Sequence, residues 1–187
     1  MRNRFPALCR SALFSVSLAA LALIVAPHHA HAQDEPKLVP DVAEVDKLLP
    51  LLPEPPADWT AEQAEGSTDD LGETKITTVH RDYQKGQSDD APTTSISILD
   101  SVANPEYVDM TTSGWTQNET TPDGYTKSLN IDGAPGFETF ENDGKHGALW
   151  LLIAKRYFLQ IETTGQEPAD LQAWLKRIDL GKLSAVK

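Results

Sequence analysis

The stretch GALWLLIAKRYFLQIE, residues 147–162, decides the fold of this chain. It is the most apolar segment after the N-terminus, and Lys155 and Arg156 interrupt it. A membrane helix needs about 20 apolar residues and does not carry two charges at its centre. A single buried helix is the alternative, but Trp, Ile, Tyr and Phe at this density favour strands. We therefore expect a β-hairpin of strands 147–154 and 157–163, with both charged residues at an exposed tip.

The first strand of this hairpin carries apolar side chains on both of its faces. Leu149, Leu151 and Ile153 alternate with Trp150, Leu152 and Ala154. Successive side chains of a strand point to opposite sides of the sheet. A strand that is apolar on both sides is typical of a sheet covered on both faces, so we expect helices on each side.

The strongest helix pattern lies at residues 168–178, PADLQAWLKRI. Its apolar residues recur at helical spacing and form one stripe, made of Leu171, Trp174, Leu175 and Ile178. Gly181 is expected to stop this helix. The helix can cover one face of the sheet. A helix at 41–52, or a short one opened by Asn104 and Pro105, can cover part of the other.

Further strands are expected at 73–83, 93–100, 125–132 and 136–141, with a less regular one at 59–65. Turn-forming sequences such as TPDG, GAPG and NDGK separate several of them. The predicted fold class is α+β, with an antiparallel sheet of about five to seven strands and helices packed on its faces.

The N-terminal residues have the order of a secretory signal peptide. Three arginines precede an uncharged apolar run at 12–25, and Ala30 and Ala32 follow as small residues. This order predicts cleavage between Ala32 and Gln33. An uncleaved anchor is the alternative, although the run is too short for a hydrocarbon core about 30 Å thick.

These patterns divide the chain into a signal peptide at 1–32, a flexible leader at 33–40 and a single α+β domain at 41–187. Cleavage would remove Cys9 and the histidine cluster at 28–31, so the mature chain would have neither a disulfide nor a thiol nucleophile. The signal holds three arginines and no acid, so its loss changes the formal net charge from −12 to −15. This acidity disfavours nucleic acid and anionic lipid as partners.

Motifs for catalysis and metal binding are not found in the sequence. His80 and His146 do not have metal-ligand spacing, and the chain has no HExxH, GxSxG, GxGxxG or P-loop pattern. The loops around Gly133 and Gly144 do not fit the EF-hand pattern. We therefore assign no catalytic, cofactor-binding or metal-ligating residue. Trp115 is the candidate ligand contact, because aromatic residues are enriched at binding surfaces.

The run GYTKSLNIDGAPGFETFENDGKHGALWLLIAKRYFLQIETTG, followed by a short helix, resembles the second half of small exported bacterial proteins of unknown function. A sheet with helices on both faces is also similar to the Mog1/PsbP type of fold. The resemblance covers roughly residues 93–180 and rests on element order and turn placement. It implies a fold and carries no catalytic motif, so it leaves function open.

The sequence thus favours an exported cell-envelope protein, periplasmic or secreted, that binds an envelope protein or a small ligand without catalysing a reaction. The alternatives are a hydrolase with an unrecognised site that uses His80 or His146, and a structural envelope protein. No membrane span is expected after cleavage. The sequence indicates no oligomeric state.

Cleavage of the signal can be measured directly. The intact mass of the exported protein should match residues 33–187, less ammonia where Gln33 has cyclised. A mass that includes residues 1–32 would contradict the predicted cleavage.

Overall fold

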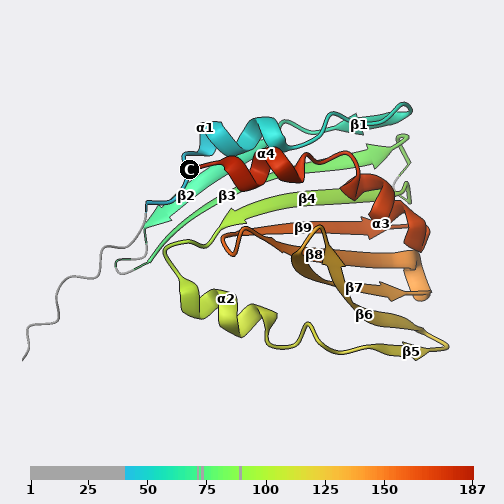
Figure 1. Cartoon of the computed structure of the whole chain (residues 1–187). Helices are drawn as coiled ribbons and strands as arrows, with labels where there is room; N and C mark the ends of the chain where they lie inside the picture. Colours follow the sequence, from blue (N-terminus) through green and yellow to red (C-terminus); the bar gives the residue numbers. More distant parts are fainter. Residues whose placement is uncertain (1–40, 71, 73, 89) are drawn as a thin grey trace, which may run out of the picture. The chain divides into compact units, whose positions relative to one another are not determined.

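The computed structural model of the chain describes residues 41–70, 72, 74–88 and 90–187. These residues form an antiparallel nine-stranded sheet in the order β1-β3-β4-β9-β8-β7-β6-β5, with β2 also paired to β3 (Figure 1). The strands are β1 Trp59–Ala61, β2 Glu65–Asp70, β3 Lys75–Lys85, β4 Thr93–Asp100, β5 Glu119–Thr121, β6 Gly124–Ile131, β7 Ala134–Glu141, β8 His146–Ile153 and β9 Tyr157–Thr164.

The hairpin expected at 147–162 is present as β8 and β9. Their pairing runs from Ile153 opposite Tyr157 to Gly147 opposite Thr163. β9 also pairs with β4 and β8 with β7, so the hairpin lies inside the sheet rather than at its edge. This position explains why both faces of β8 are apolar.

The strand number of five to seven was wrong, because the sheet has nine strands. Two of the strands in excess are polar and lie at its margins. Every residue of β2 and of β5 is exposed. Such strands lack the alternation of apolar and polar residues by which a sequence reveals a half-buried strand.

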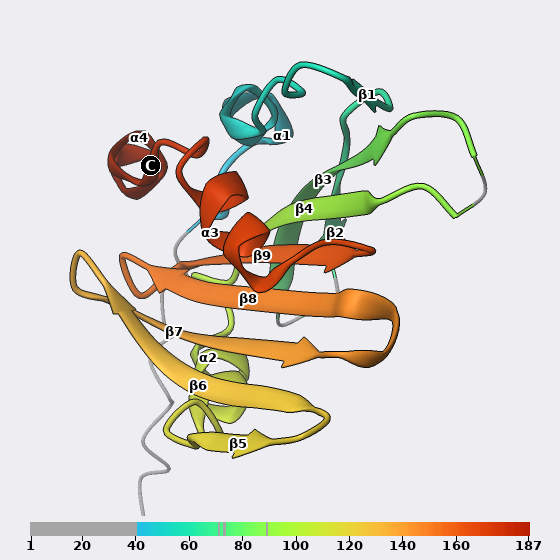
Figure 2. The same ribbon diagram turned by 90° about the vertical axis from the view of Figure 1, so that its right-hand side faces the viewer.

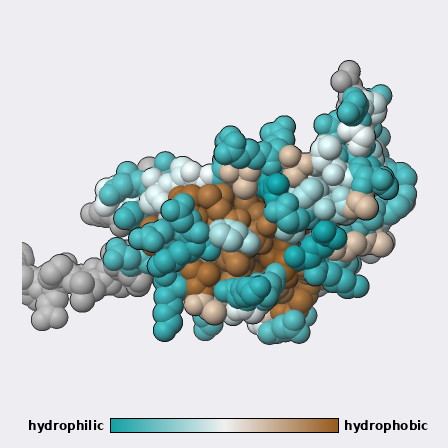
Figure 3. Space-filling model, turned by 90° about the horizontal axis from the view of Figure 1, so that it is seen from above, coloured by the Kyte–Doolittle hydropathy of each residue, from teal (hydrophilic) through white to brown (hydrophobic). Residues whose placement is uncertain are grey.

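One face of the sheet, called the first face below, carries three of the helices (Figures 1 and 2). They are α1 Val45–Leu48, which continues as the 3₁₀ turn η1 Leu49–Leu51, α3 Pro168–Leu175 and α4 Leu180–Ala185. The core beneath them includes Val79, Ile96, Ile98, Leu149, Leu151, Leu159 and Ile161. Seen from the side of α1 and α4, apolar residues form a broad area among polar ones (Figure 3).

Two expectations about these helices were wrong. The helix near residues 41–52 is shorter than expected and packs into the same core as α3, so it does not cover the opposite face. Gly181 does not end the C-terminal helix. α3 ends at Leu175, and Gly181 lies inside α4, which Asp179 caps by accepting a hydrogen bond from the Lys182 amide at 2.8 Å.

The opposite face, called the second face below, is covered in part by α2 Pro105–Thr112. Asn104 caps this helix, as its position before Pro105 predicted, and its Oδ1 accepts a hydrogen bond from the Tyr107 amide at 3.1 Å. The helix and the residues after it cover a second, smaller core that includes Leu99, Trp115, Leu152 and Phe158. Helices on both faces confirm the two-sided cover predicted from β8.

Trp174 joins α3 to the first face. The residue is 3 % exposed. The centroid of its ring lies 5.1 Å from that of Trp59 and 4.8 Å from that of Tyr83. Its Nε1 donates to Gln166 Oε1 at 3.2 Å, so the polar atom is also satisfied. The helix approaches β8 closely at Gly147, where an added Cβ would lie 2.9 Å from Leu171.

Arg156 is not an exposed tip residue, and this corrects the sequence-based expectation. Its side chain is 17 % exposed and forms two hydrogen bonds with the fully buried carboxylate of Asp100, at 2.9 and 2.7 Å. The hydrogen bonds to Asp100 raise the pKa of the Arg156 guanidinium. Lys155, by contrast, is exposed as expected.

No helix in the part of the chain that the structure describes is long and apolar enough to cross a membrane. The predicted signal peptide, its cleavage site at Ala32 and Gln33, and the leader at 33–40 lie outside the described residues.

Trp174 and Arg156 should therefore contribute to stability, whereas Lys155, beside Arg156 at the hairpin tip, should not. Truncation of a buried Trp costs about 3–5 kcal/mol, so Trp174→Ala should lower the urea midpoint sharply. Arg156→Ala should do the same, because removal of one partner of a buried ion pair costs about 3–5 kcal/mol. Lys155→Ala should stay within about 0.5 kcal/mol of the parent. Similar small effects in all three variants would contradict this account of the fold.

Candidate functional site

Basic strand residues lie on one face of the described sheet, whereas carboxylates lie on both. Side chains alternate along each strand, and the pairing register shows which of them share a face. The lysines and arginines of the described strands all lie on the first face; they are Lys75, Arg81, Lys85 and Lys127. The charged strand residues of the second face are carboxylates, apart from its two histidines; they are Glu65, Asp69, Asp82, Glu119, Glu141 and Glu162.

Only one end of the second face is covered by α2. Beyond Trp150 and Phe137, whose ring centroids lie 6.1 Å apart, the strands present half-buried polar side chains such as Ser97, Gln160 and Glu162. We call this uncovered part of the second face the open face. It carries carboxylates from β3 across to β5, with an aromatic pair at the border of the helix-covered end.

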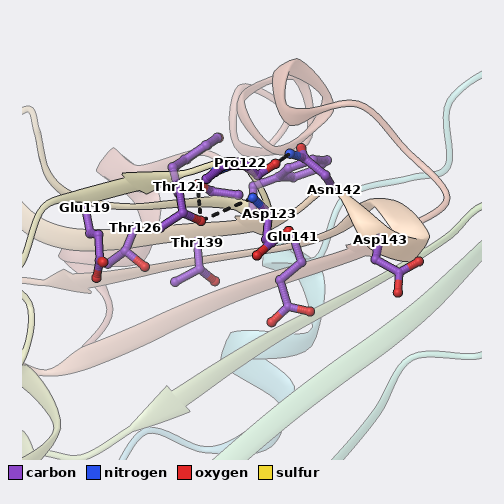
Figure 4. Close-up of a pocket in the computed structure, with 12 residues that line it drawn as sticks. Glu119, Thr121, Pro122, Asp123, Thr126, Thr139, Glu141, Asn142 and Asp143 are labelled. Carbon is purple, nitrogen blue, oxygen red and sulfur yellow. Dashed lines mark hydrogen bonds between the residues drawn. The ribbon is translucent and has the colours of Figure 1, made fainter.

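A cleft of about 630 Å³ lies at the edge of the open face, where β5 and β7 end and β6 begins. Its carboxylates come from Glu119 and Glu141 on strands and from Asp123 and Asp143 on turns. Thr126 and Thr139 lie between the two strand carboxylates. Figure 4 shows the side chains of Glu119, Glu141 and Asp143 extending in the same direction.

Hydrogen bonds between the turns hold the cleft in shape. The backbone amide of Asn142 donates to the Asp123 carbonyl at 2.8 Å, and its side-chain Nδ2 donates to the Pro122 carbonyl at 2.8 Å. Thr121 Oγ1 accepts from the Asp123 amide at 3.2 Å. The β5–β6 turn is therefore tied to the end of β7, and the carboxylates at this end of the sheet sit on a braced backbone.

The cleft carboxylates differ from a neighbouring carboxylate on the other side of the sheet. Glu138 is 1 % exposed on the first face, and it accepts hydrogen bonds from Lys127 Nζ at 2.7 Å, Tyr125 Oη at 2.6 Å and Gln172 Nε2 at 2.7 Å. Burial, together with Glu138, raises the pKa of Tyr125. Glu138 is thus neutralised within the fold.

No salt bridge among the described residues involves Glu119, Asp123, Glu141 or Asp143. These groups repel one another, and salt screens that repulsion because they lie at the surface. A cation bound in the cleft would relieve it. Within the described parts of the chain, no group of three or more His, Cys, Asp or Glu residues has the arrangement of a metal site.

Both histidines of the predicted mature chain lie on the second face. His80 stands opposite Glu65 on β2 and opposite Ser97 on β4. His146 stands opposite Glu141, and its Nδ1 lies 3.3 Å from Thr164 Oγ1. The sheet thus brings each histidine beside a carboxylate and a hydroxyl, which the spacing along the sequence did not show.

Trp115 does not have the exposed position expected of a ligand contact. Its side chain is 8 % exposed, and its ring packs edge-on against Phe158 with centroids 5.9 Å apart. Its observed role is to close the core beneath α2. The half-buried Trp150, interpreted from the sequence as a packing residue alone, is the tryptophan that borders the open face.

The acidic open face was not predicted from the sequence. Alternation assigns Glu119, Glu141 and Glu162 to one side of their own strands, and this signal was available. The side on which each strand lies in the common sheet depends on pairing order and register, which no local pattern specifies.

Comparisons of the chain with protein families, with curated proteins and with solved structures found no match. The resemblance to the Mog1/PsbP type of fold therefore stays a prediction.

No salt bridge among the described residues neutralises the cleft carboxylates, so removal of two of their charges should not destabilise the fold. Glu119→Gln with Glu141→Gln should leave the urea midpoint unchanged or raise it at low salt, because like charges are removed. The gain should disappear at high salt. Glu138→Gln is the matched control on β7, and it should lower the midpoint because it weakens a buried network. Destabilisation by the double variant would show that the cleft carboxylates support the fold.

Proposed function

We propose that the chain is an exported, non-enzymatic binding module that takes a basic segment of an envelope protein on its open face and in the adjoining cleft. The observation that carries this proposal is that the second face of the described strands has six carboxylates and no lysine or arginine, whereas Asp100 and Glu138 on the first face are each paired with a basic residue. A surface of one sign attracts ligands of the opposite sign and steers their approach.

The extent of the acidic surface favours a protein segment over a small cation. Neighbouring strands lie about 4.8 Å apart, so Glu119 on β5 and Glu141 on β7 are separated by about 10 Å in the direction across the strands. Glu162 on β9 is a further two strands away. One small cation could meet only part of this set, whereas a chain with several basic residues could meet it at successive points.

The aromatic border adds a contact that discriminates between cations. Trp150 is half-buried beside Phe137 and lies across from Gln160, next to the open carboxylates. Aromatic rings at protein surfaces bind both apolar groups and the cationic groups of Arg and Lys. Export is supported by the order of basic, apolar and small residues at 1–32.

Binding of a defined basic peptide tests the proposal. Decalysine, titrated by calorimetry at low salt, should bind saturably and weaken as salt is added. Glu119→Gln with Glu141→Gln should weaken binding about tenfold, equivalent to about 1.4 kcal/mol. The control is Asp46→Asn with Glu106→Gln, which removes the same charge from exposed positions on α1 and α2.

The control distinguishes a site from general acidity. An equal loss of affinity in both double variants would mean that net charge alone attracts the peptide. No saturable binding to the parent protein would overturn the proposed function.

Hydrolysis is the second candidate, favoured by the row Glu65, His80 and Ser97 on adjacent strands. A carboxylate, an imidazole and a hydroxyl are the groups of a serine hydrolase. The described structure has no hydrogen bond that joins them. Turnover of p-nitrophenyl esters that is lost in both His80→Ala and Ser97→Ala would favour this candidate over the binding module.

A further inference from the structure

Among the described residues, the outer edge of β6 is only partly paired. β6 pairs with β7 from Gly124 to Ile131, but with β5 only from Gly124 to Thr126. Unpaired backbone groups at a strand edge are a template for another strand. This edge is separate from the open face, which consists of side chains above the sheet.

The direction of the Ser128 amide identifies the free groups. This amide donates to Asn118 Oδ1 at 3.0 Å, so it points away from β7. Backbone groups alternate in direction along a strand, so the amide and carbonyl of Asn130 also point outward. The β6–β7 turn leads to the same assignment. Ile131 and Ala134 flank its two central residues and form the closing hydrogen-bonded pair, so the backbone groups of Ile131 point toward β7 and those of Asn130 point away from it.

Asn118 already places a peptide-like group on this edge. Its carboxamide oxygen accepts from the Ser128 amide, and its Nδ2 donates to Ser128 Oγ at 3.1 Å. A carboxamide has the same donor and acceptor as a backbone peptide group. The contact shows that the edge accepts such a group at Ser128, two residues before Asn130.

The side chains beside the free edge suit an extended apolar segment. Leu129 and Ile131 are half-buried on the first face. Ile131 also lines a groove of about 710 Å³, together with Ala134, Leu152 and Leu180. β6 itself has no carboxylate, although the chain is strongly acidic. The edge therefore offers backbone hydrogen bonds beside apolar contacts.

We propose that the edge of β6 at Asn130, beyond the position that Asn118 occupies, binds an extended segment of a partner protein as an added strand. Backbone hydrogen bonds to Asn130 hold the segment, and alternate apolar side chains pack on Leu129, on Ile131 and in the groove. This interaction does not depend on the proposed binding of basic segments at the open face.

A pair of variants at Asn130 isolates the backbone contact. Asn130→Pro removes an outward amide, which contributes nothing to the β6–β7 ladder, and proline is tolerated at strand edges for this reason. Asn130→Ala keeps the amide. Both variants lose the hydrogen bond that Asn130 Oδ1 accepts from the Gly133 amide, so they differ in the backbone donor and the proline ring.

The experiment begins with selection of random 12-residue peptides displayed on phage against the intact domain. The enriched peptides should alternate apolar and polar residues. A synthetic copy of the most enriched one should bind Asn130→Ala within twofold of the parent and Asn130→Pro at least tenfold more weakly. Hydrogen exchange at the Asn130 amide of the parent should slow when this peptide is bound.

The exchange measurement keeps the test decisive even where the proline variant unfolds. Unchanged exchange at Asn130, or equal affinity for both folded variants, would overturn the proposal, as would a selection that enriches no alternating sequence. A dimer of the parent that becomes monomeric on Asn130→Pro would also overturn it, by showing that a second copy occupies the edge.

Discussion

The buried carboxylate of Asp100 is the constraint on which the joining of separate parts of this fold depends. It lies at the end of β4, and it accepts hydrogen bonds from Arg156 in the turn before β9 and from the Ala43 amide at 2.6 Å. Arg156 also donates to the Asp41 carbonyl at 3.1 Å. A buried charge without partners costs several kcal/mol, so these contacts must form together. The ion pair thereby holds the beginning of the described chain against the central strands.

The position of this ion pair determines how the sheet divides into covered and uncovered regions. The chain beyond Ala43 continues into α1 on the first face, and the chain after Asp100 continues into α2 on the second. Of the described helices, α1, α3 and α4 thus lie on the first face and α2 lies on the second. The remaining part of the second face stays open, and its carboxylates stay hydrated. A hydrated carboxylate needs no partner within the fold, whereas buried Glu138 has three.

The two proposed binding surfaces arise from two different features of the same sheet. The open face has no lysine or arginine from the described strands, because all of these lie on the first face. Beyond Thr126, no described strand pairs with the outer edge of β6, because β5 pairs with it only from Gly124 to Thr126. Electrostatic attraction at the first surface is long-range and sensitive to salt, whereas backbone pairing at the second is short-range and less sensitive. The two interactions can therefore be measured separately.

The hairpin at 147–162 and the apolar stripe that contains Trp174 were determined by the sequence alone, because each is encoded by side chains close together along the chain. The role of Arg156 was not, since its partner Asp100 is 56 residues away. Neither were the polar strands β2 and β5, which have no apolar alternation to mark them. The acidic open face was decided by tertiary structure, because only the pairing order places Glu65, Glu162 and Glu119 on the same side of one sheet. Local periodicity specifies which residues share the face of a strand, whereas long-range pairing specifies which strands share the face of a sheet.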